Sequence, residues 1–215
     1  MARHFLLLDV DNTLYARACG VVDRVDERIN RYLIERIGIA AAEVDETRRQ
    51  LWRDYGTTLF GLMHRVEIDP DDYLQFVHAV DHGAHLGPDS ALAEMLARLP
   101  LLKVAVTNGS LGHARAVLEC LGIRELFFRV FALERLRYLP KPYVHAYQAV
   151  VTDLHTTGRD CILVEDNAAN VRAARQLGMW TVHVADGVEP APEAHATIAR
   201  IHDLEGALAA VPSGS

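Results

Sequence analysis

Two aspartates follow directly on the first apolar run of the chain. The run Phe5–Leu8 is continuous rather than alternating, which is typical of a strand buried on both faces of a parallel sheet. Asp9 and Asp11 come immediately after it. Charges this close to an apolar core must be paired, hydrated or bound to a metal, and ligands bind at the carboxyl ends of strands in open α/β sheets. The two aspartates therefore predict a functional site at this edge of a sheet.

Apolar runs and helical patterns alternate along most of the remaining chain. Further strands are predicted at Leu101–Val106, Arg129–Ala132, Cys161–Val164 and Trp180–Val184. Helices are predicted from Ser110, as the cap, through Leu121, and over Val144–Leu154 and Ala168–Leu177. Strands that alternate with helices predict an α/β fold with a doubly wound parallel sheet.

Residues 15–87 interrupt this alternation, because they contain no convincing strand. Apolar residues recur at helical spacing from Val22 to Ile37, and further helices are predicted over Ala40–Tyr55 and Pro70–Val80. We therefore expect a core domain of residues 1–14 and 88–215 and an all-helical cap insert of residues 15–87. An insert attached at the carboxyl end of the first strand is expected to act as a lid over the site, rather than as a decoration without a catalytic role.

Composition and charge argue against several classes of protein. The formal net charge of −7 argues against a surface for nucleic-acid polymers, and no apolar stretch approaches the roughly 20 residues of a membrane helix. The N-terminal apolar run is too short for a signal peptide, and the three cysteines are widely spaced, so we expect a cytoplasmic protein. Residues 212–215 are expected to fray. Whether the chain is a monomer or a homodimer stays open.

Three later segments carry polar groups at the ends of predicted strands or in loops. They are Thr107-Asn108-Gly109, Lys141-Pro142 and Glu165-Asp166-Asn167. Parallel strands bring such segments to one edge of the sheet, where the carboxylates of Asp9 and Asp166 suit Mg²⁺. The Thr107 hydroxyl, the amides of its turn and the start of the helix at Ser110 can bind phosphate oxygens, and Lys141 adds a positive charge. The set predicts a phosphate site with a metal.

The paired aspartates also suit covalent chemistry. Attack of Asp9 on phosphorus would give an aspartyl-phosphate, with Mg²⁺ and Lys141 neutralising the repulsion between carboxylate and phosphate. A second acid must then protonate the leaving oxygen and later deprotonate water. Asp11 is placed for that role, since residues two apart in an extended segment face the same side.

These segments, in this order along the whole chain, resemble the four motifs of the haloacid dehalogenase (HAD) superfamily. The resemblance implies a Rossmann-like core, a small-molecule phosphate monoester as substrate, Mg²⁺ and an aspartyl-phosphate intermediate. It implies the following roles: Asp9 as nucleophile, Asp11 as general acid/base that also gives its backbone carbonyl to the metal, Thr107, Asn108 and Lys141 as holders of the phosphoryl group, Asp166 as metal ligand, and Thr13, Glu165 and Asn170 as supporting or water-mediated residues.

Residues of the insert show a narrower likeness. Asp11–Tyr15, Tyr55–Leu59 and the pattern from Tyr73 to Asp81 are similar to the pyrimidine 5′-nucleotidase-like group. This likeness implies hydrolysis of nucleoside monophosphates such as UMP or CMP, with substrate contacts from Tyr15, Tyr55 and Thr58. Tyr55 is equally consistent with the apolar core of the cap.

Other functions stay open at this point. The chain could hydrolyse another metabolite such as a sugar phosphate, act as a phosphomutase, or bind phosphate without catalysis. A dehalogenase is disfavoured by the presence of Asp11.

Two further sets of residues have ambiguous patterns. His78, His82 and His85 could line one helix face as a metal site, but Gly83 interrupts that helix, which favours a solvated or hinge-proximal face. Trp52 and Trp180 are expected to be packing residues.

Overall fold

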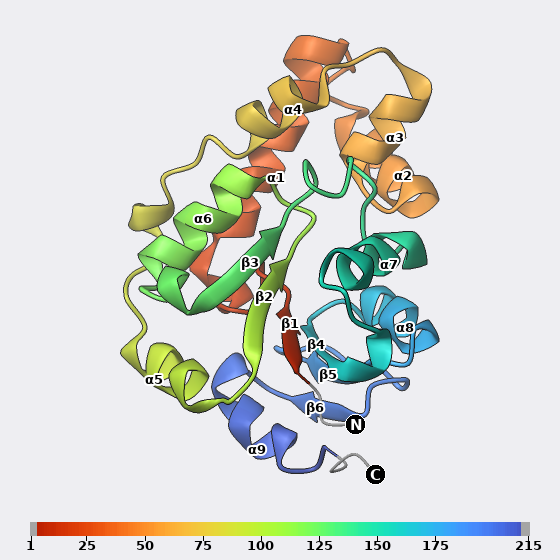
Figure 1. Ribbon diagram of the computed structural model, residues 1–215. Helices are drawn as coiled ribbons and strands as arrows, with labels where there is room; N and C mark the ends of the chain where they lie inside the picture. Colours follow the sequence, from red (N-terminus) through yellow and green to blue (C-terminus); the bar gives the residue numbers. More distant parts are fainter. Residues whose placement is uncertain (1–3, 212–215) are drawn as a thin grey trace.

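A six-stranded, fully parallel sheet forms the centre of the protein. The computed structural model describes residues 4–211. The strand order is β3-β2-β1-β4-β5-β6, so that β1 lies between β2 and β4 (Figure 1). The strands are β1 (Phe5–Leu8), β2 (Leu102–Val106), β3 (Phe127–Phe131), β4 (Cys161–Glu165), β5 (Trp180–Val184) and β6 (Ala196–Ile198). The predicted α/β, Rossmann-like fold is confirmed.

The first strand is buried on both faces, as its continuous apolar run predicts. Leu6 and Leu8 belong to one core cluster, with helices α5 (Ser90–Arg98) and α6 (Leu111–Cys120). Leu7 belongs to a second cluster on the opposite face, with α7 (Val144–Asp153) and α8 (Ala168–Gln176). The sheet is therefore covered by helices on both faces, and only its edges and strand ends are left for a site.

The predicted helices of the core are confirmed to within a residue or so at each end. Ser110 caps α6 by accepting a hydrogen bond from the His113 amide at 3.1 Å. The sequence patterns missed α5, the edge strand β6 and the short C-terminal helix α9 (Leu204–Leu208). The predicted strand at Arg129–Ala132 in fact begins two residues earlier, at Phe127. The expected fraying of residues 212–215 lies outside the described residues.

Residues 15–87 form helices and no strand. They contain α1 (Val21–Tyr32), α2 (Val44–Tyr55), α3 (Thr58–Arg65) and α4 (Pro70–Val77), whose buried side chains form a third cluster. The predicted helical stretch through Ile37 is confirmed in its extent, and α1 continues directly into a π-helical turn at Leu33–Ile37 before Gly38, which has φ +83°.

Two helix boundaries of this region are corrected, and one helix was missed. The helix predicted to begin at Ala40, α2, begins at Val44 instead, because residues 41–43 form a turn. The end of α4 moves from Val80 to Val77, where the His78 ring lies 3.0 Å from the carbonyl oxygen of Leu74. The unpredicted α3 is capped by Thr57, which accepts from the Phe60 amide at 3.1 Å.

The helical region lies beyond the carboxyl ends of β1, β2 and β3 (Figure 1). A loop that follows β3 contacts it directly: Leu133 is buried in its core cluster, and the Tyr138 hydroxyl donates to Asp71 at 2.7 Å. Within residues 4–211, every helix is too short or too polar to cross a bilayer.

Candidate active site

The turn after β1 fixes the Asp9 carboxylate at the centre of the sheet's carboxyl edge. The Asp9 amide donates to the Val164 carbonyl at 3.0 Å, which extends the pairing of β1 with β4 by one residue. Asn12 adopts a left-handed conformation with φ +58°, which asparagine tolerates better than most residues and which turns the chain back. The Thr13 hydroxyl then donates to Asp9 Oδ2 at 2.8 Å.

Lys141 is the buried cation of this site. Only 1% of the residue is exposed, and its ammonium donates to Asp9 Oδ1 at 2.5 Å, to Glu165 Oε2 at 2.7 Å and to the Val106 carbonyl at 2.9 Å. All three donor positions of the ammonium are thus used. Lys141 therefore joins the carboxyl ends of β1, β2 and β4.

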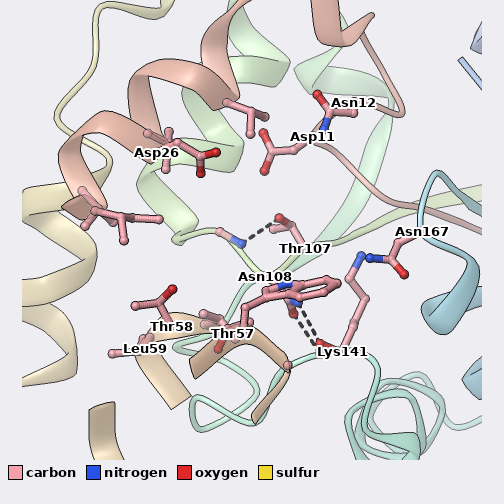
Figure 2. A pocket seen from close by; sticks show the side chains of 18 of the residues that line it. Asp11, Asn12, Asp26, Thr57, Thr58, Leu59, Thr107, Asn108, Lys141 and Asn167 are labelled. Atoms are coloured by element: carbon pink, nitrogen blue, oxygen red, sulfur yellow. Dashed lines mark hydrogen bonds between the residues drawn. The ribbon is translucent and has the colours of Figure 1, made fainter. Parts of the chain in front are cut away.

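Asn108 holds the backbone of Lys141 in place. Its side-chain amide donates to the Lys141 carbonyl at 2.9 Å, and its side-chain oxygen accepts from the Lys141 amide at 2.8 Å, as the paired dashed lines in Figure 2 show. Asn108 also lines the cavity, and this pairing leaves one hydrogen of its side-chain amide for another acceptor, so its phosphate contact stays a prediction. The signal available in the sequence, an Asn-Gly turn, could not reveal a partner 33 residues away.

Three carboxylates gather around the single ammonium of Lys141. Asp9, Glu165 and Asp166 each offer an oxygen, and these oxygens all lie within 4.8 Å of one another. Burial, followed by the charge of Glu165, raises the pKa of Asp9 to about 7 despite the opposing effect of Lys141. Burial likewise raises the pKa of Glu165 to about 7 and that of Asp166 to about 6.

This charge balance fits a divalent cation. Three ionised carboxylates against one ammonium leave an excess of two negative charges in a buried site. Mg²⁺ takes hard oxygen donors, typically one or two carboxylates from the protein with water and substrate completing its shell, so the cluster can supply its ligands while Glu165 stays paired with Lys141. Glu165, expected in a supporting role, has a second function that the sequence did not reveal, because it forms the ion pair with Lys141.

The hydroxyl of Thr107 stands beside this cluster. Its oxygen accepts from the Gly109 amide at 2.8 Å, so its hydrogen stays available for an anionic oxygen. Ser110 caps α6 but does not line the cavity described below, whereas Asn170, at the start of α8, does. The turn before α6 therefore contributes Thr107 and Gly109 to the lining of the cavity, whereas Ser110 contributes only to the cap of the helix.

Asp11 has different surroundings from Asp9. Its Oδ1 accepts from the Tyr15 hydroxyl at 2.5 Å and contacts His113 Nε2 at 2.7 Å. Burial opposes ionisation here, but the interaction with His113 outweighs it and holds the pKa of Asp11 well below its usual range. The two aspartates of the first motif thus have pKa values pushed in opposite directions, and in the ligand-free site Asp11 is the more readily ionised of the two.

A cavity of about 600 Å³ connects these groups with the helical region. Figure 2 shows Asp11, Thr107 and Lys141 on one side of it, and Thr57, Thr58 and Leu59 on the other. Thr58 lines the cavity and its hydroxyl also pairs with Tyr73. Tyr55 does not line the cavity; it packs in the apolar cluster of the insert. Tyr15 does not line it either, since its hydroxyl is directed to Asp11.

The two tryptophans differ from each other. Trp180 is buried in the core, as predicted. The packing prediction for Trp52 is wrong, because 57% of this residue is exposed and it lines the cavity. The sequence around Trp52, in α2, carries no signal that would have separated this exposed tryptophan from the buried Trp180.

The three histidines at the end of the insert do not form a metal site. His82 Nε2 lies 2.9 Å from His113 Nδ1, and the His78 ring centroid lies 4.6 Å from that of His113. His85 is directed elsewhere, with Nδ1 2.9 Å from the Cys19 carbonyl. All three lie at the end of α4 or on the segment between α4 and α5, and a solvated face is wrong for His82, which is buried. His113 was not predicted; its place in the first turn of the helix after Thr107 was the available signal.

The comparison with protein families agrees with this geometry. The model described as haloacid dehalogenase-like hydrolase matches residues 5–178. The chain belongs to this family. Among curated proteins, this HAD-like hydrolase is 26% identical over 198 residues to Phosphate metabolism protein 8 of Saccharomyces cerevisiae (strain ATCC 204508 / S288c), with 84% of the chain and 61% of that protein covered. The chain therefore spans less than two thirds of that relative.

Solved structures show the same fold at low identity. A HAD phosphatase from Thermococcus onnurineus matches with a TM-score of 0.63 and 17% identity, over 97% of this chain and 98% of the other. The HAD-hydrolase YfnB from Bacillus subtilis, bound to magnesium, matches with a TM-score of 0.61 and 18% identity, over 97% and 99%. Several other structures of this fold are haloacid dehalogenases. The fold alone thus leaves the leaving group open.

Proposed function

We propose that this HAD-like hydrolase is a Mg²⁺-dependent phosphate monoester hydrolase that works through an aspartyl-phosphate on Asp9. The observation that carries the proposal is the buried Lys141 ammonium, bonded to both Asp9 and Glu165 beside the free hydroxyl hydrogen of Thr107. A lysine and a hydroxyl beside a nucleophilic carboxylate suit a phosphoryl group, whose charge would otherwise repel that carboxylate.

The metal site of the proposal uses the carboxylate cluster. Asp9, Asp166 and the backbone carbonyl of Asp11 would hold Mg²⁺, with Glu165 and Asn170 behind them. Bound there, the cation would neutralise charge on the cluster and on the phosphoryl oxygens. Residues 15–87 would act as the cap of the site, over a core of residues 1–14 and 88–215.

The residues of the chain then divide the reaction into two steps. Asp9, oriented through both oxygens by Lys141 and Thr13, forms a bond to phosphorus as the bond to the leaving oxygen breaks. The negative charge of a bound phosphoryl group favours the protonated form of Asp11, which then gives its proton to that oxygen. In the second step Asp11 takes a proton from water, whose oxygen attacks phosphorus and releases Asp9 and inorganic phosphate.

Two neighbouring reactions are distinguishable from this one. A halide leaves without a proton, so a dehalogenase needs no acid at the position of Asp11, and here that acid is held by two side chains. A phosphomutase would return the phosphoryl group to substrate, so inorganic phosphate would not accumulate. A module that only binds phosphate would show no turnover with any monoester.

As substrate we propose a nucleoside 5′-monophosphate, UMP or CMP in the first place, so that the leaving group is the nucleoside. The exposed indole of Trp52 lines the cavity together with Thr57 and Thr58, and an aromatic face of this kind suits a nucleobase. The cavity volume of about 600 Å³ leaves room for a base and a ribose beyond the phosphate. A sugar phosphate is the alternative. The test is phosphate release from a panel of UMP, CMP and sugar phosphates, with and without Mg²⁺; release from none of them would overturn the proposed activity.

Removal of the Trp52 indole should weaken nucleotide binding selectively. For Trp52→Ala we expect the KM for UMP to rise roughly tenfold through loss of stacking, with little change for a small sugar phosphate. Trp52→Phe should keep most of the affinity. Phe128→Ala is the matched control, because Phe128 is equally exposed on β3 but does not line the cavity. An equal rise in KM for both kinds of substrate would argue against a base-binding role.

Mg²⁺ should stabilise the protein more at pH 8 than at pH 5.5. The pKa values of Asp9 and Glu165 lie at about 7 when folded, above their ordinary 3.8 and 4.5. Between these values the folded metal-free protein holds more protons than the unfolded chain, so its free energy of unfolding falls as the pH rises. Mg²⁺ binds the ionised carboxylates and should reverse that loss, by about 2.7 kcal/mol at a concentration a hundred times its Kd.

The measurement is the thermal unfolding midpoint with MgCl₂ and with NaCl of equal ionic strength. Asp166→Asn should reduce the Mg²⁺-dependent shift. A shift of the same size at both pH values would contradict binding at this carboxylate cluster.

A further inference from the structure

The two carboxylate oxygens of Asp11 have different surroundings. The Tyr15 hydroxyl, at 2.5 Å, and His113 Nε2, at 2.7 Å, both approach Oδ1. Neither reaches Oδ2. That oxygen lies near Gly109 and Thr107, which line the cavity together with Asp11: a Cβ placed on Gly109 would be 3.6 Å from Oδ2 and 3.2 Å from the Thr107 hydroxyl. One oxygen is thus anchored and the other faces the place of the phosphoryl group.

The second ring nitrogen of His113, the one that does not contact Asp11, also has a hydrogen-bond partner. His113 Nδ1 lies 2.9 Å from His82 Nε2, and both residues are buried. The His82 ring is also hydrogen-bonded to the backbone of Val80. Hydrogen bonds therefore link His82 to His113 and His113 to Asp11.

These hydrogen bonds cross from the helical region into the core. His82 lies in the 3₁₀ turn His82–Ala84, on the segment by which the chain returns from α4 to the sheet domain, whereas His113 lies on α6 of the core. The His78 ring, directly after α4, packs on the imidazole of His113 at a centroid distance of 4.6 Å. The place of His113 is thus set by residues of the return segment.

We propose that His113, supported by His82, is a positioning residue that keeps Oδ2 of Asp11 aimed at the leaving-group oxygen. The proposal rests on the phosphate monoester hydrolase activity proposed above. It makes the placement of the acid dependent on the segment that joins the helical region to the core.

The physical basis is the freedom of a carboxylate to rotate. The terminal torsion of aspartate has a broad profile, so an unanchored Asp11 would turn its oxygens through many orientations. Two donors on one oxygen fix that torsion. A proton-transfer group must lie within hydrogen-bond reach of its target, and a misplacement of about 1 Å costs roughly a hundredfold in rate. The transferred proton moves from Oδ2 to the leaving oxygen, while His113 and Tyr15 keep their bonds to Oδ1.

Two amide substitutions at position 113 separate the two contacts of the imidazole. A glutamine amide reaches the place of Nε2, so His113→Gln keeps a donor for Asp11. An asparagine amide reaches only the place of Nδ1, so His113→Asn keeps a partner for His82 and loses the bond to Asp11. The two variants differ by one methylene and remove the same ring.

The readout is kcat/KM for two esters that differ in their need for an acid. One is an alkyl monoester that the wild-type protein hydrolyses, UMP or glycerol 3-phosphate; the other is p-nitrophenyl phosphate, whose phenolate leaves without a proton. For His113→Asn we expect a loss of about 10- to 100-fold on the alkyl ester and less than about threefold on the aryl ester. His113→Gln should recover most of the alkyl-ester activity.

His82→Leu and His85→Gln test the return segment. His82→Leu should give a smaller loss than His113→Asn, again confined to the alkyl ester, because it loosens His113 without removing it. His85→Gln, on the same segment but directed to the Cys19 carbonyl, should match the wild type. A His82→Leu protein with the wild-type ratio of the two kcat/KM values would overturn the part assigned to the return segment.

The outcomes separate this inference from the proposed function. Equal losses on both esters in His113→Asn would show a structural role and overturn the positioning of Asp11, as would no loss on either. A wild-type protein that releases phosphate from neither ester would overturn the proposed function itself, and the positioning role with it.

Discussion

Asp9→Asn should abolish phosphate release while the protein stays folded. The asparagine amide cannot form the acyl phosphate, so we expect kcat/KM to fall roughly a thousandfold or more. The substitution removes one of three clustered carboxylates, and the raised pKa of Asp9 shows that the metal-free fold favours its neutral form. The unfolding midpoint of the metal-free variant at pH 8 should therefore equal or exceed that of the wild type.

Trapping of the intermediate gives the direct measurement. Acid quenching of the wild type with ³²P-labelled substrate should leave label on the peptide that contains Asp9, and Asp9→Asn should leave none. Asp186→Asn is the control, because Asp186 is exposed and does not line the cavity. Normal turnover by Asp9→Asn would contradict the covalent mechanism.

Lys141→Met should damage both activity and stability. The variant loses the ammonium that contacts Asp9 and Glu165, so the phosphoryl group and the nucleophile repel each other and kcat/KM should fall roughly a hundredfold or more. At pH 8 two buried carboxylates are left without their cation, which should lower the free energy of unfolding by about 3 to 5 kcal/mol. At pH 5.5 these carboxylates, with pKa values of about 7 even beside Lys141, take up protons, and the loss should shrink.

Urea unfolding at the two pH values measures this difference. Lys103→Met is the matched control, because Lys103 is also buried but its ammonium donates to the Leu99 carbonyl, at 2.5 Å, away from the cavity. It should keep full activity. A destabilisation by Lys141→Met of the same size at pH 5.5 and pH 8 would show that packing, rather than unpaired charge, accounts for the loss.

The meeting of Asp9, Thr107 and Glu165 at one edge was predictable from the sequence, because it follows from topology. Each comes at or directly after the carboxyl end of a continuous apolar strand, and the strands are parallel. No tertiary detail is needed for that inference, since parallel neighbours end on the same side.

Contacts that depend on packing were not predictable. His113 and Asp11 are 102 residues apart, and only the placement of α6 against the first turn brings them together. The short helix α3 was missed for a related reason. Its Gly61 is unfavourable for an isolated helix, but a Cβ there would lie 2.7 Å from Leu51, so close packing on α2 requires it. The exposure of Trp52 likewise depends on how α2 sits over the cavity.

The apolar cluster of the helical insert is separate from the two clusters that flank the sheet. Residues such as Trp52 and Thr58 therefore shape the far half of the cavity without supporting the strands that hold Asp9. Substitutions around Trp52 and Thr58 can therefore change the preferred substrate while Asp9 and the strands that hold it stay unchanged. For protein engineering, this separation marks α2 and α3, rather than Tyr15 or the return segment with His82, as the place for a mutant library.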